Sequence, residues 1–330
     1  MTEPYPLLFK PILKDYIWGG RNLENLGREL PKSGNVAESW EISGHKDGMS
    51  YVINGIYAGI ALQDVLEQLG EDLVGSNNKW AIKRDIFPLL VKLLDANQRI
   101  SIQVHPNDEY ARQHEGNELG KSEMWVVLDA KPDAAIVHGL SEQLTPQKFA
   151  KAITNGTLEK YLNKLPIKAG DFICVPAGSL HTILGGAVMA EIQQNSNTTY
   201  RVYDWNRVDE NGQSRTLNIE KALDVINFDQ VGCTLPVPQL VEKHVSFSRE
   251  VLCKSRYFTT ERLFLHANGT YRGFCDGSTL EIWGILTGEA IVAGQHLEKI
   301  QFVLLPANLG PFTVTAIQDA VLLRTFVEKC

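Results

Sequence analysis

The stretch Gly170-Asp-Phe-Ile-Cys-Val-Pro-Ala-Gly-Ser-Leu-His181 has the pattern of two strands joined by a tight turn. Residues 171–175 are mostly apolar or β-branched, and such residues favour a strand. Pro176 and Gly178 follow directly, and this combination is typical of a turn. The next strand begins at His181, so the turn delivers an imidazole at the start of a strand.

The spacing is Gly-x5-Pro-x-Gly-x2-His, and it matches the second sequence motif of the cupin proteins at every fixed position. The resemblance implies a double-stranded β-helix barrel in which His181 points into the barrel mouth as a metal ligand. An isolated histidine is more often an ordinary core or surface residue. The complete spacing favours the metal-ligand interpretation.

Short β-rich segments separated by turn residues dominate the rest of the chain, above all after residue 245. Such a pattern is typical of a barrel or a sandwich. Helical periodicity is confined to three stretches, residues 62–69, 145–162 and 217–226. We therefore predict a mainly β fold, made of double-stranded β-helix (cupin or jelly-roll) barrels with a few inserted α-helices.

Two β modules are expected, with the boundary near Pro236-Val-Pro238. Residues 1–240 form the predicted metal-binding catalytic domain with the inserted helices. Residues 241–330 form a cupin-like β domain without metal, because the segment Leu305-Pro-Ala-Asn-Leu-Gly-Pro-Phe312 resembles the Pro-Ala-Gly turn but contains no histidine.

The composition is that of a globular protein, since 44% of the 330 residues are apolar and 22% are charged. A formal net charge of -7 argues against general affinity for nucleic acid or anionic membranes. We expect no membrane span and no signal peptide, because the first residues contain acid and proline where a signal needs a basic start. The five scattered cysteines argue against a disulfide framework and predict a reducing cytoplasm.

A polar face on one strand marks a candidate site. Residues two apart on a strand share a face, so Ser101, Gln103 and His105 point the same way. Such a face meets solvent, a ligand or a metal, and this strand alone does not decide which. In cupins an acidic ligand follows on the next strand, and Glu123 occupies that place. Imidazole and carboxylate ligands suit zinc and leave a coordination position open.

Four segments resemble the type I mannose-6-phosphate isomerases, in particular their shorter bacterial form. They are Ile100-Ser-Ile-Gln-Val-His-Pro-Asn-Asp108, Lys121-Ser-Glu-Met-Trp125, Pro176-Ala-Gly-Ser-Leu-His181 and Glu191-Ile-Gln-Gln-Asn-Ser-Asn-Thr-Thr-Tyr-Arg-Val-Tyr-Asp-Trp205. Trp18-Gly-Gly20 and Ala37-Glu-Ser-Trp-Glu41 are similar to the N-terminal segment of that family. The resemblance covers most of residues 5 to 230, and the last third is similar only in general character.

The resemblance implies one Zn²⁺ per chain, with Gln103, His105, Glu123 and His181 as its ligands. Gln103 is the least usual zinc ligand of the four. The implied activity is the interconversion of D-mannose 6-phosphate and D-fructose 6-phosphate. This reaction moves a proton between C1 and C2 through an enediol, so negative charge develops on substrate oxygens that a metal and a guanidinium can stabilise.

The essential arginine of the family corresponds to Arg201, for which a structural or phosphate-binding role is the alternative. Glu191 is the favoured proton-transferring base, and Lys121 is its competitor, which could instead bind phosphate. Lys92 and Ser101 match positions of the substrate pocket in this family. Lys92 interrupts an apolar run, and its ammonium could equally extend to solvent.

Two further interpretations compete with the isomerase. One is another metal-dependent cupin, either a sugar isomerase or an iron oxygenase, although the Gln103 and Arg201 segments argue against an oxygenase. The other is a non-catalytic cupin that binds a sugar phosphate, against which Lys121 and Glu191 argue, because binding alone needs no poised base. The expected partner is a small sugar phosphate, and the expected assembly is a monomer or a small homo-oligomer.

Overall fold

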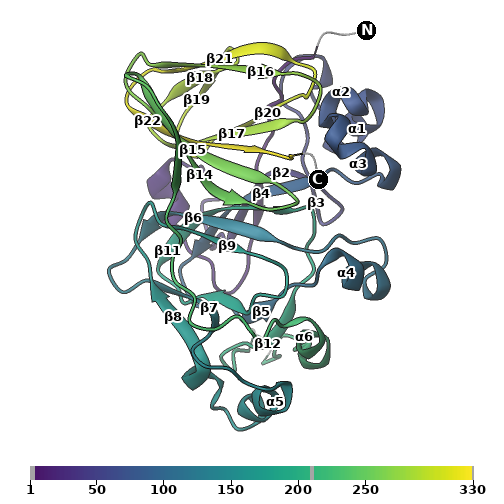
Figure 1. The fold of residues 1–330 in the computed structure, drawn as a ribbon, viewed down its shortest axis with the longest axis vertical. Helices are drawn as coiled ribbons and strands as arrows, with labels where there is room; N and C mark the ends of the chain where they lie inside the picture. Colours follow the sequence, from purple (N-terminus) through teal and green to yellow (C-terminus); the bar gives the residue numbers. More distant parts are fainter. Residues whose placement is uncertain (1–3, 209–211, 329–330) are drawn as a thin grey trace.

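The computed structural model of the chain describes residues 4–208 and 212–328, and it stacks four antiparallel sheets in layers (Figure 1). The first sheet has the strand order β1-β2-β4-β11-β6-β9, with β3 paired to β2. The second has the order β12-β5-β10-β7-β8. The third and fourth have the orders β13-β14-β15-β22-β17-β20 and β16-β21-β18-β19. The predicted mainly β fold with a few inserted helices is therefore confirmed.

The strands of the first two sheets come from the first two thirds of the chain. Their bounds are β1 Ile12–Lys14, β2 Glu38–His45, β3 Gly48–Met49, β4 Leu89–Ala96, β5 Ile102–Val104, β6 Glu123–Ala130, β7 Ala135–Leu140, β8 Leu162–Pro166, β9 Phe172–Val175, β10 His181–Ile183, β11 Ala187–Gln194 and β12 Tyr200–Tyr203. The predicted strand–turn–strand unit is present as β9, a turn and β10. Gly178 in this turn has a φ of +88°, a conformation that glycine adopts without strain.

The strands of the last two sheets follow without any described helix between them. Their bounds are β13 Gln239–Lys243, β14 Phe247–Lys254, β15 Thr259–Leu265, β16 Thr270–Cys275, β17 Glu281–Thr287, β18 Ala290–Val292, β19 Gln295–Leu297, β20 Phe302–Leu305, β21 Gly310–Ala316 and β22 Ala320–Phe326. Sheets one and two form the N-terminal sheet pair, and sheets three and four form the C-terminal sheet pair.

The two large sheets face each other across a shared hydrophobic core in the middle of the molecule. Val91 and Ile192 of the first sheet pack in the same cluster as Ile282 and Leu323 of the third. The opposite faces of the same strands line the interior of each sheet pair, where further apolar clusters lie. Strands buried on both faces explain why β4 and β11 have no exposed residue. The division into domains at residue 240 stays a prediction.

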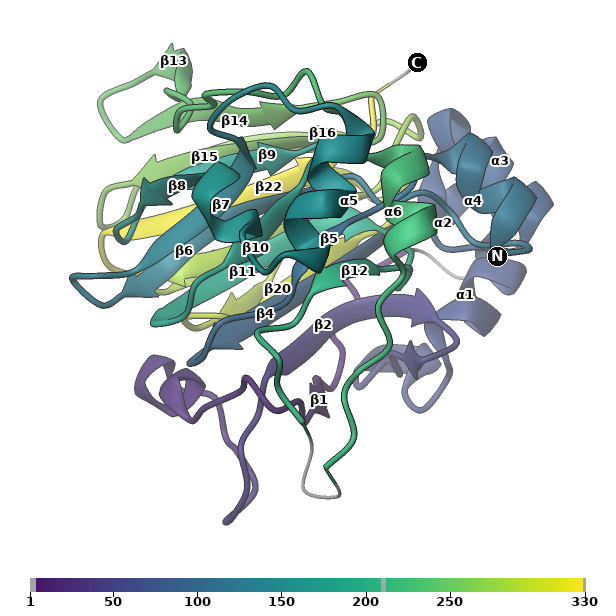
Figure 2. The same cartoon turned by 90° about the horizontal axis from the view of Figure 1, so that it is seen from below.

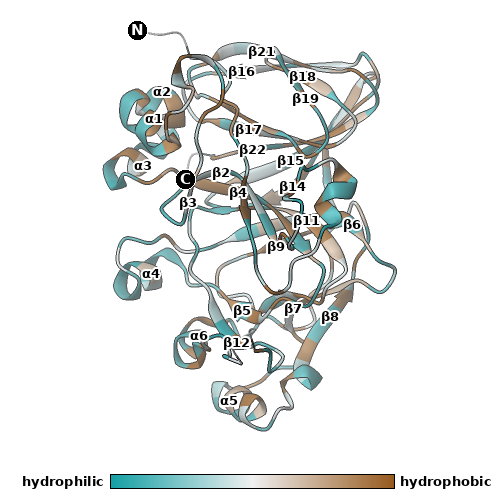
Figure 3. Cartoon of the chain, turned by 180° about the vertical axis from the view of Figure 1, so that it is seen from behind, coloured by the Kyte–Doolittle hydropathy of each residue, from teal (hydrophilic) through white to brown (hydrophobic). Residues whose placement is uncertain are grey.

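The helices lie on the outside of the sheets. Their bounds are α1 Leu62–Leu69, α2 Glu71–Val74, α3 Lys79–Arg84, α4 Asp108–His114, α5 Pro146–Thr154 and α6 Ile219–Val225, with 3-10 turns at Asn22–Leu26, Gly55–Tyr57, Ser76–Asn78 and Leu158–Tyr161. Helices α5 and α6 cover the second sheet when the molecule is seen from below (Figure 2). Hydrophilic and hydrophobic residues are mixed along these helices (Figure 3). Among the described residues, none of the helices is long and apolar enough to cross a membrane.

The three predicted helical stretches are confirmed with small shifts. The stretch 62–69 is α1, and 217–226 contains α6. The stretch 145–162 divides into α5 and a 3-10 turn, as Gly156 suggested. Thr145 caps α5 by accepting a hydrogen bond from the Lys148 backbone N–H, and Pro146 occupies the first turn. Helices α2, α3 and α4 were not predicted, because four to seven residues are too few to show a helical period.

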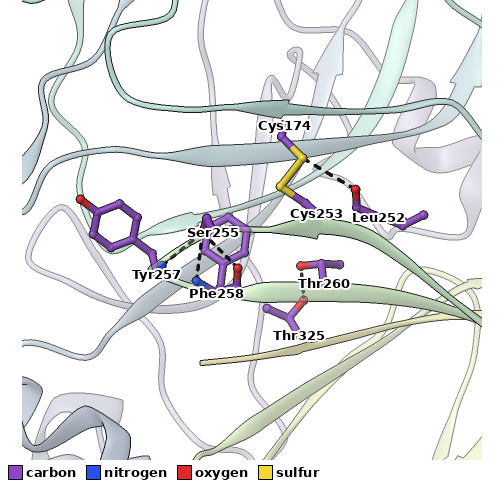
Figure 4. The surroundings of a disulfide bond; sticks show 8 residues. All are labelled: Cys174, Leu252, Cys253, Ser255, Tyr257, Phe258, Thr260 and Thr325. Atoms are coloured by element: carbon purple, nitrogen blue, oxygen red, sulfur yellow. Dashed lines mark hydrogen bonds between the residues drawn. A yellow bond between two sulfur atoms is a disulfide. The ribbon is translucent and has the colours of Figure 1, made fainter. Parts of the chain in front are cut away.

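A disulfide joins the two halves of the molecule between Cys174 on β9 and Cys253 on β14 (Figure 4). Their Cα atoms are 5.9 Å apart, which is an ordinary separation for a bridge. The sequence argued against a disulfide framework, and it gave no signal for this pair, whose members are 79 residues apart. Cys233 and Cys275 are free thiols, and Cys330 lies outside the described residues.

Candidate metal centre and active site

The second sheet brings three of the predicted site residues side by side. His181 on β10 pairs with Gln103 on β5, and Gln103 pairs with Arg201 on β12. His105 follows β5 by one residue. Because neighbours in register on adjacent strands share a face, these side chains point into the space between the first and second sheets.

The first sheet supplies the facing wall of that space. Glu191 on β11 lies in register between Lys92 on β4 and Trp125 on β6. Glu123, two residues before Trp125, shares its face of β6 and is 2% exposed. The interior of the N-terminal sheet pair is therefore lined by charged and aromatic side chains where a barrel core would otherwise be apolar.

Three of the predicted metal ligands meet in this interior. The ligand atoms of His105, Glu123 and His181 all lie within 4.8 Å of one another. The Glu123 carboxylate is 3.5 Å from His105 Nε2 through Oε2 and 3.3 Å from His181 Nε2 through Oε1. All three side chains are buried.

Both imidazoles are oriented by backbone carbonyls. His105 Nδ1 donates to Thr198 O at 2.8 Å, and His181 Nδ1 donates to Ser179 O at 2.9 Å. With Nδ1 carrying the proton, each Nε2 lone pair faces Glu123, which is how metal-binding histidines are usually held. Burial lowers the pKa of His105 well below its usual value and that of His181 to about 3, so both rings stay neutral and able to coordinate.

The contacts within the His105–Glu123–His181 cluster are those expected of a site for a divalent cation. Glu123 Oε1 is buried and has no hydrogen-bond partner, an arrangement that is costly unless a ligand satisfies the atom. The Lys121 ammonium lies 3.0 Å from His105 Nε2 and also bonds Glu123 Oε2, so a positive charge already contacts two of the three ligand groups. Two neutral imidazoles and one carboxylate form a donor set that transition metals favour.

Gln103 lies beside the three ligands rather than apart from them. Its amide Nε2 is 3.3 Å from His181 Nε2, and its Oε1 accepts a hydrogen bond from Ser101 Oγ at 3.2 Å. The predicted polar face of Ser101, Gln103 and His105 therefore faces the sheet interior and not solvent.

The candidate base Glu191 lies between two ammonium groups. Its Oε1 is 3.3 Å from Lys121 Nζ and 3.7 Å from Lys92 Nζ, and its Oε2 accepts a hydrogen bond from Trp125 Nε1 at 3.2 Å. Burial alone would raise the pKa of this carboxyl, but the Lys121 and Lys92 charges outweigh burial and lower it. Glu191 is therefore ionised at neutral pH and able to accept a proton.

Lys92 is enclosed rather than extended to solvent. It is 3% exposed, and its ammonium lies 3.4 Å from Glu38 Oε2 and 5.1 Å from the centre of the Trp40 ring. Burial opposes its charge, but the Glu38 and Glu191 carboxylates raise the pKa above its usual value. Lys92 is thus a charged residue that is already paired with two carboxylates.

A cavity of about 120 Å³ opens onto these groups. The predicted residues that line it are Lys92, Ser101, Gln103, Lys121, His181, Glu191 and Arg201. The lining residues that were missed at the sequence level include Tyr16, Glu38, Trp125 and Arg215. Glu38 and Trp125 lie inside segments that resemble the family, and that resemblance is a signal by which they could have been found. Tyr16 and Arg215 carried no signal, since no motif or period marks them.

Tyr16 and Arg201 also line the cavity. Burial, together with the Glu38 and Asp47 charges, raises the pKa of Tyr16 to about 12, so its hydroxyl remains a hydrogen-bond donor. Arg201 Nε is buried without a hydrogen-bond partner. The cavity therefore brings together one edge of the candidate cation site, an ionised candidate base and an unsatisfied guanidinium.

Two facing sheets that hold two imidazoles and a carboxylate between them define a metal-binding cupin. A family model for the phosphomannose isomerase type I catalytic domain matches residues 7–122. A probable mannose-6-phosphate isomerase of Bacillus subtilis, GmuF, is 37% identical, with 94% of this chain and 96% of that protein covered. The chain therefore belongs to the type I mannose-6-phosphate isomerase family.

Two further relatives agree with this assignment. A mannose-6-phosphate isomerase of Streptococcus mutans is 39% identical over 77% of both chains. The crystal structure of the mannose 6-phosphate isomerase from Bacillus subtilis superposes with a TM-score of 0.85 at 32% identity, covering 97% of this chain and 99% of that one. The similarity thus includes the last third of the chain, which at the sequence level resembled the family only in general character.

Proposed function

We propose that this chain catalyses the reversible isomerisation of D-mannose 6-phosphate and D-fructose 6-phosphate. The observation that carries the proposal is the buried His105–Glu123–His181 cluster with Lys121 and Glu191 against it, next to a cavity that His181, Lys121 and Glu191 line. A sugar-binding protein without turnover has no need for an ionised base next to a cation site. The relatives that bear the name mannose-6-phosphate isomerase support the same reaction.

The proposed cofactor is one Zn²⁺ per chain, held by His105, Glu123 and His181 with Gln103 as the fourth protein ligand. Histidine and carboxylate ligands with an open position are common at catalytic zinc sites. When bound, the ion supplies Lewis acidity that stabilises negative charge on the substrate oxygens near C1 and C2.

Glu191 is the proposed base. It takes the proton from C2 of the open-chain aldose and returns it to C1, and the reverse reaction uses the same group. Lys92 and Trp125 hold this carboxylate through a charge and a hydrogen bond, which fixes its direction and keeps it ionised. Lys121, paired with both Glu123 and Glu191, is the competing candidate, and its ammonium is closer to Glu191 than that of Lys92.

The proposed substrate contacts are Ser101, Lys121 and Arg201. Ser101 and Lys121 line the cavity next to the cation cluster, and Arg201 lines it from the second sheet. Lys92 acts through Glu191, because its ammonium is already paired with Glu38 and Glu191. We further propose that the enzyme works in the cytoplasm as a monomer or a small homo-oligomer, as suits an enzyme of bacterial sugar metabolism.

The test is a coupled assay that follows fructose 6-phosphate formed from mannose 6-phosphate. Activity is measured before chelation, after chelation, and after addition of Zn²⁺, with Mg²⁺ addition as the matched control. The proposal expects activity that is lost with the chelator and restored by Zn²⁺. A chain that contains full zinc and turns over no mannose 6-phosphate contradicts the isomerase and leaves a binding protein.

The choice of base is tested by proton exchange in deuterated water. Wild-type enzyme should place deuterium at C2 of mannose 6-phosphate. Glu191→Gln should lose this exchange while it keeps zinc, because the amide cannot accept the proton. Exchange retained in Glu191→Gln and lost in Lys121→Met would transfer the role of base to Lys121.

A further inference from the structure

Two arginines bind a single carboxylate next to the active-site cavity, and a third arginine lies close to it in the chain. Asp204, 6% exposed, follows β12 and accepts hydrogen bonds from Arg215 Nε to Oδ2 at 2.8 Å and from Arg215 Nη2 to Oδ1 at 2.6 Å. Arg207 bonds the same Oδ1. Arg201 lies three residues before Asp204 on the strand itself. One carboxylate is therefore paired with two guanidinium groups, and its charge also acts on the Arg201 guanidinium.

Two of the three arginines line the cavity that holds the cation cluster, namely Arg201 and Arg215, whereas Arg207 does not. The Arg215 side chain is 27% exposed, and its paired contact with Asp204 fixes the plane of the guanidinium. Within residues 4–208 and 212–328, Arg201 forms no ion pair, and its Nε has no hydrogen-bond partner although it is buried. Burial and the neighbouring Arg215 charge lower the pKa of Arg201, which agrees with two like charges at one end of the cavity.

The other cations of the cavity are already compensated. Lys92 contacts the Glu38 and Glu191 carboxylates, and Lys121 contacts those of Glu123 and Glu191. The unbalanced positive charge that faces the cavity is therefore at the Arg201 and Arg215 end. A phosphate monoester carries a charge of about -1.5 to -2 at pH 7, and its oxygens match the planar donor set of arginine.

We propose that Arg201 and Arg215 form the phosphate-binding end of the cavity, with Asp204 as the residue that positions Arg215. This inference rests on the proposed function and specifies where the substrate lies. The 6-phosphate docks at the two arginines, and the C1–C2 end of the sugar then reaches Lys121 and Glu191. Asp204 makes no contact with substrate and acts only by holding Arg215 through its Nε and Nη2 atoms.

The test measures binding separately from turnover. D-glucitol 6-phosphate has the length and charge of the substrate but no carbonyl, so it binds without isomerising, and D-glucitol lacks the phosphate. Calorimetric titration of the zinc-loaded enzyme gives the Kd of both probes. The variants are Arg215→Gln and the matched control Arg207→Gln, which loses a partner of the same Asp204 oxygen outside the cavity.

Arg215→Gln should weaken D-glucitol 6-phosphate binding by roughly 10- to 100-fold, the value of a lost charge-assisted contact. Arg207→Gln should stay within about 3-fold of wild type, well below one such contact. Arg215→Lys keeps the positive charge but loses the planar guanidinium, so its Kd should lie between those of the other two variants. This variant tests the proposal if Arg215→Gln fails to fold. Asp204→Asn should raise KM for mannose 6-phosphate more than it lowers kcat, whereas a merely structural role would lower the amount of folded enzyme and leave KM unchanged.

Failure of this inference is distinguishable from failure of the proposed function. Wild-type turnover of mannose 6-phosphate combined with unchanged binding in Arg215→Gln overturns the phosphate assignment and keeps the isomerase. Equal weakening in Arg215→Gln and Arg207→Gln also overturns it, because the network would then act only on the local structure. A third outcome is a wild-type protein that binds D-glucitol 6-phosphate but does not turn over mannose 6-phosphate. If Arg215→Gln abolishes that binding, the phosphate site is supported and the isomerase activity is contradicted.

Discussion

Each sheet pair contains a cluster of buried charges in its interior, and the two clusters differ in how completely they are satisfied. In the C-terminal pair, Arg324 bonds both Glu261 and Glu281. Arg249 bonds the remaining Glu261 oxygen, and Trp283 is a second donor to Glu281 Oε2. Every carboxylate oxygen there has a donor from the chain itself. This cluster is a closed network that holds strands β14, β15, β17 and β22 together.

In the N-terminal pair, the corresponding space keeps atoms that the described chain does not satisfy. Glu123 Oε1, Glu191 Oε1 and Arg201 Nε are all buried without a hydrogen-bond partner. Unsatisfied buried polar atoms are costly, and native structures retain them where a ligand or a function compensates. Both clusters are charged and buried. The comparison shows that complete hydrogen bonding of the polar atoms is what distinguishes the structural cluster from the candidate site in this molecule.

The largest effect is expected when the site cluster loses a ligand. His181→Ala should lower kcat/KM by roughly 10³-fold, since the Lewis acid contributes several kcal/mol to the transition state. Zinc content should fall together with activity, and elemental analysis measures it. Thermal unfolding serves as the control for folding. Full zinc content in His181→Ala would remove this residue from the metal site.

The fully hydrogen-bonded cluster of the C-terminal sheet pair should affect stability rather than activity. Arg324→Met leaves Glu261 and Glu281 buried without their main partner, so it should lower the free energy of unfolding by about 3–5 kcal/mol. The kcat/KM of the molecules that remain folded should equal that of wild type. Urea unfolding and the coupled assay, both below the unfolding transition, measure the two quantities. A change in kcat/KM would show that the C-terminal pair takes part in the reaction.

Loss of the disulfide between the two sheet pairs should have a smaller effect on stability. Cys174→Ser removes the Cys174–Cys253 cross-link and should lower the free energy of unfolding by about 2–4 kcal/mol under non-reducing conditions. The same loss should follow when wild type is reduced, and reduction should have no effect on the variant. Peptide mapping without reductant detects the linked pair. Equal stability of reduced and non-reduced wild type would mean that the bridge does not constrain the chain.

The smallest effect concerns a carboxyl group at the joint between the regions. Arg28 donates to Glu41 and to the Ile300 backbone carbonyl, and burial raises the pKa of Glu41 to about 7. A pKa that is higher in the folded protein means that stability is fully present at low pH and is lost as the pH rises through about 7. Between pH 5 and pH 7 the loss amounts to about 2 kcal/mol.

Glu41→Gln should abolish this part of the pH dependence, because the amide does not titrate. Urea unfolding of wild type and variant at pH 5, 6, 7 and 8 yields the difference as a function of pH. Parallel curves for the two proteins would show that Glu41 does not bind its proton more tightly in the folded state.

Local patterns in the sequence predicted the mainly β fold and the three stretches that contain α1, α5 and α6, but not the shorter helices. The Gly170 to His181 stretch specified a strand, a turn and a strand, and the structure contains all three. The family resemblance placed His105, Glu123 and His181 in one set, and the register of β5 against β10 is what brings the two histidines together. Motifs succeed here because each ligand lies next to its own turn or strand end.

Features that depend on tertiary packing could not be predicted from the sequence. The shared core between the two large sheets joins Val91 to Leu323, and no local period reports that contact. The Cys174–Cys253 pair and the contact of Arg215 with the cavity are equally long-range. Lys92 was visible as a charge in an apolar run, but its two carboxylate partners come from other strands.

The most direct test of the central claim is a zinc titration of chelator-treated enzyme during turnover of mannose 6-phosphate. The unsaturated cluster in the N-terminal sheet pair predicts that activity rises linearly and reaches its plateau at one Zn²⁺ per chain, with no rise in Glu123→Ala. Full activity without added metal, or a plateau that Glu123→Ala reproduces, would contradict the account.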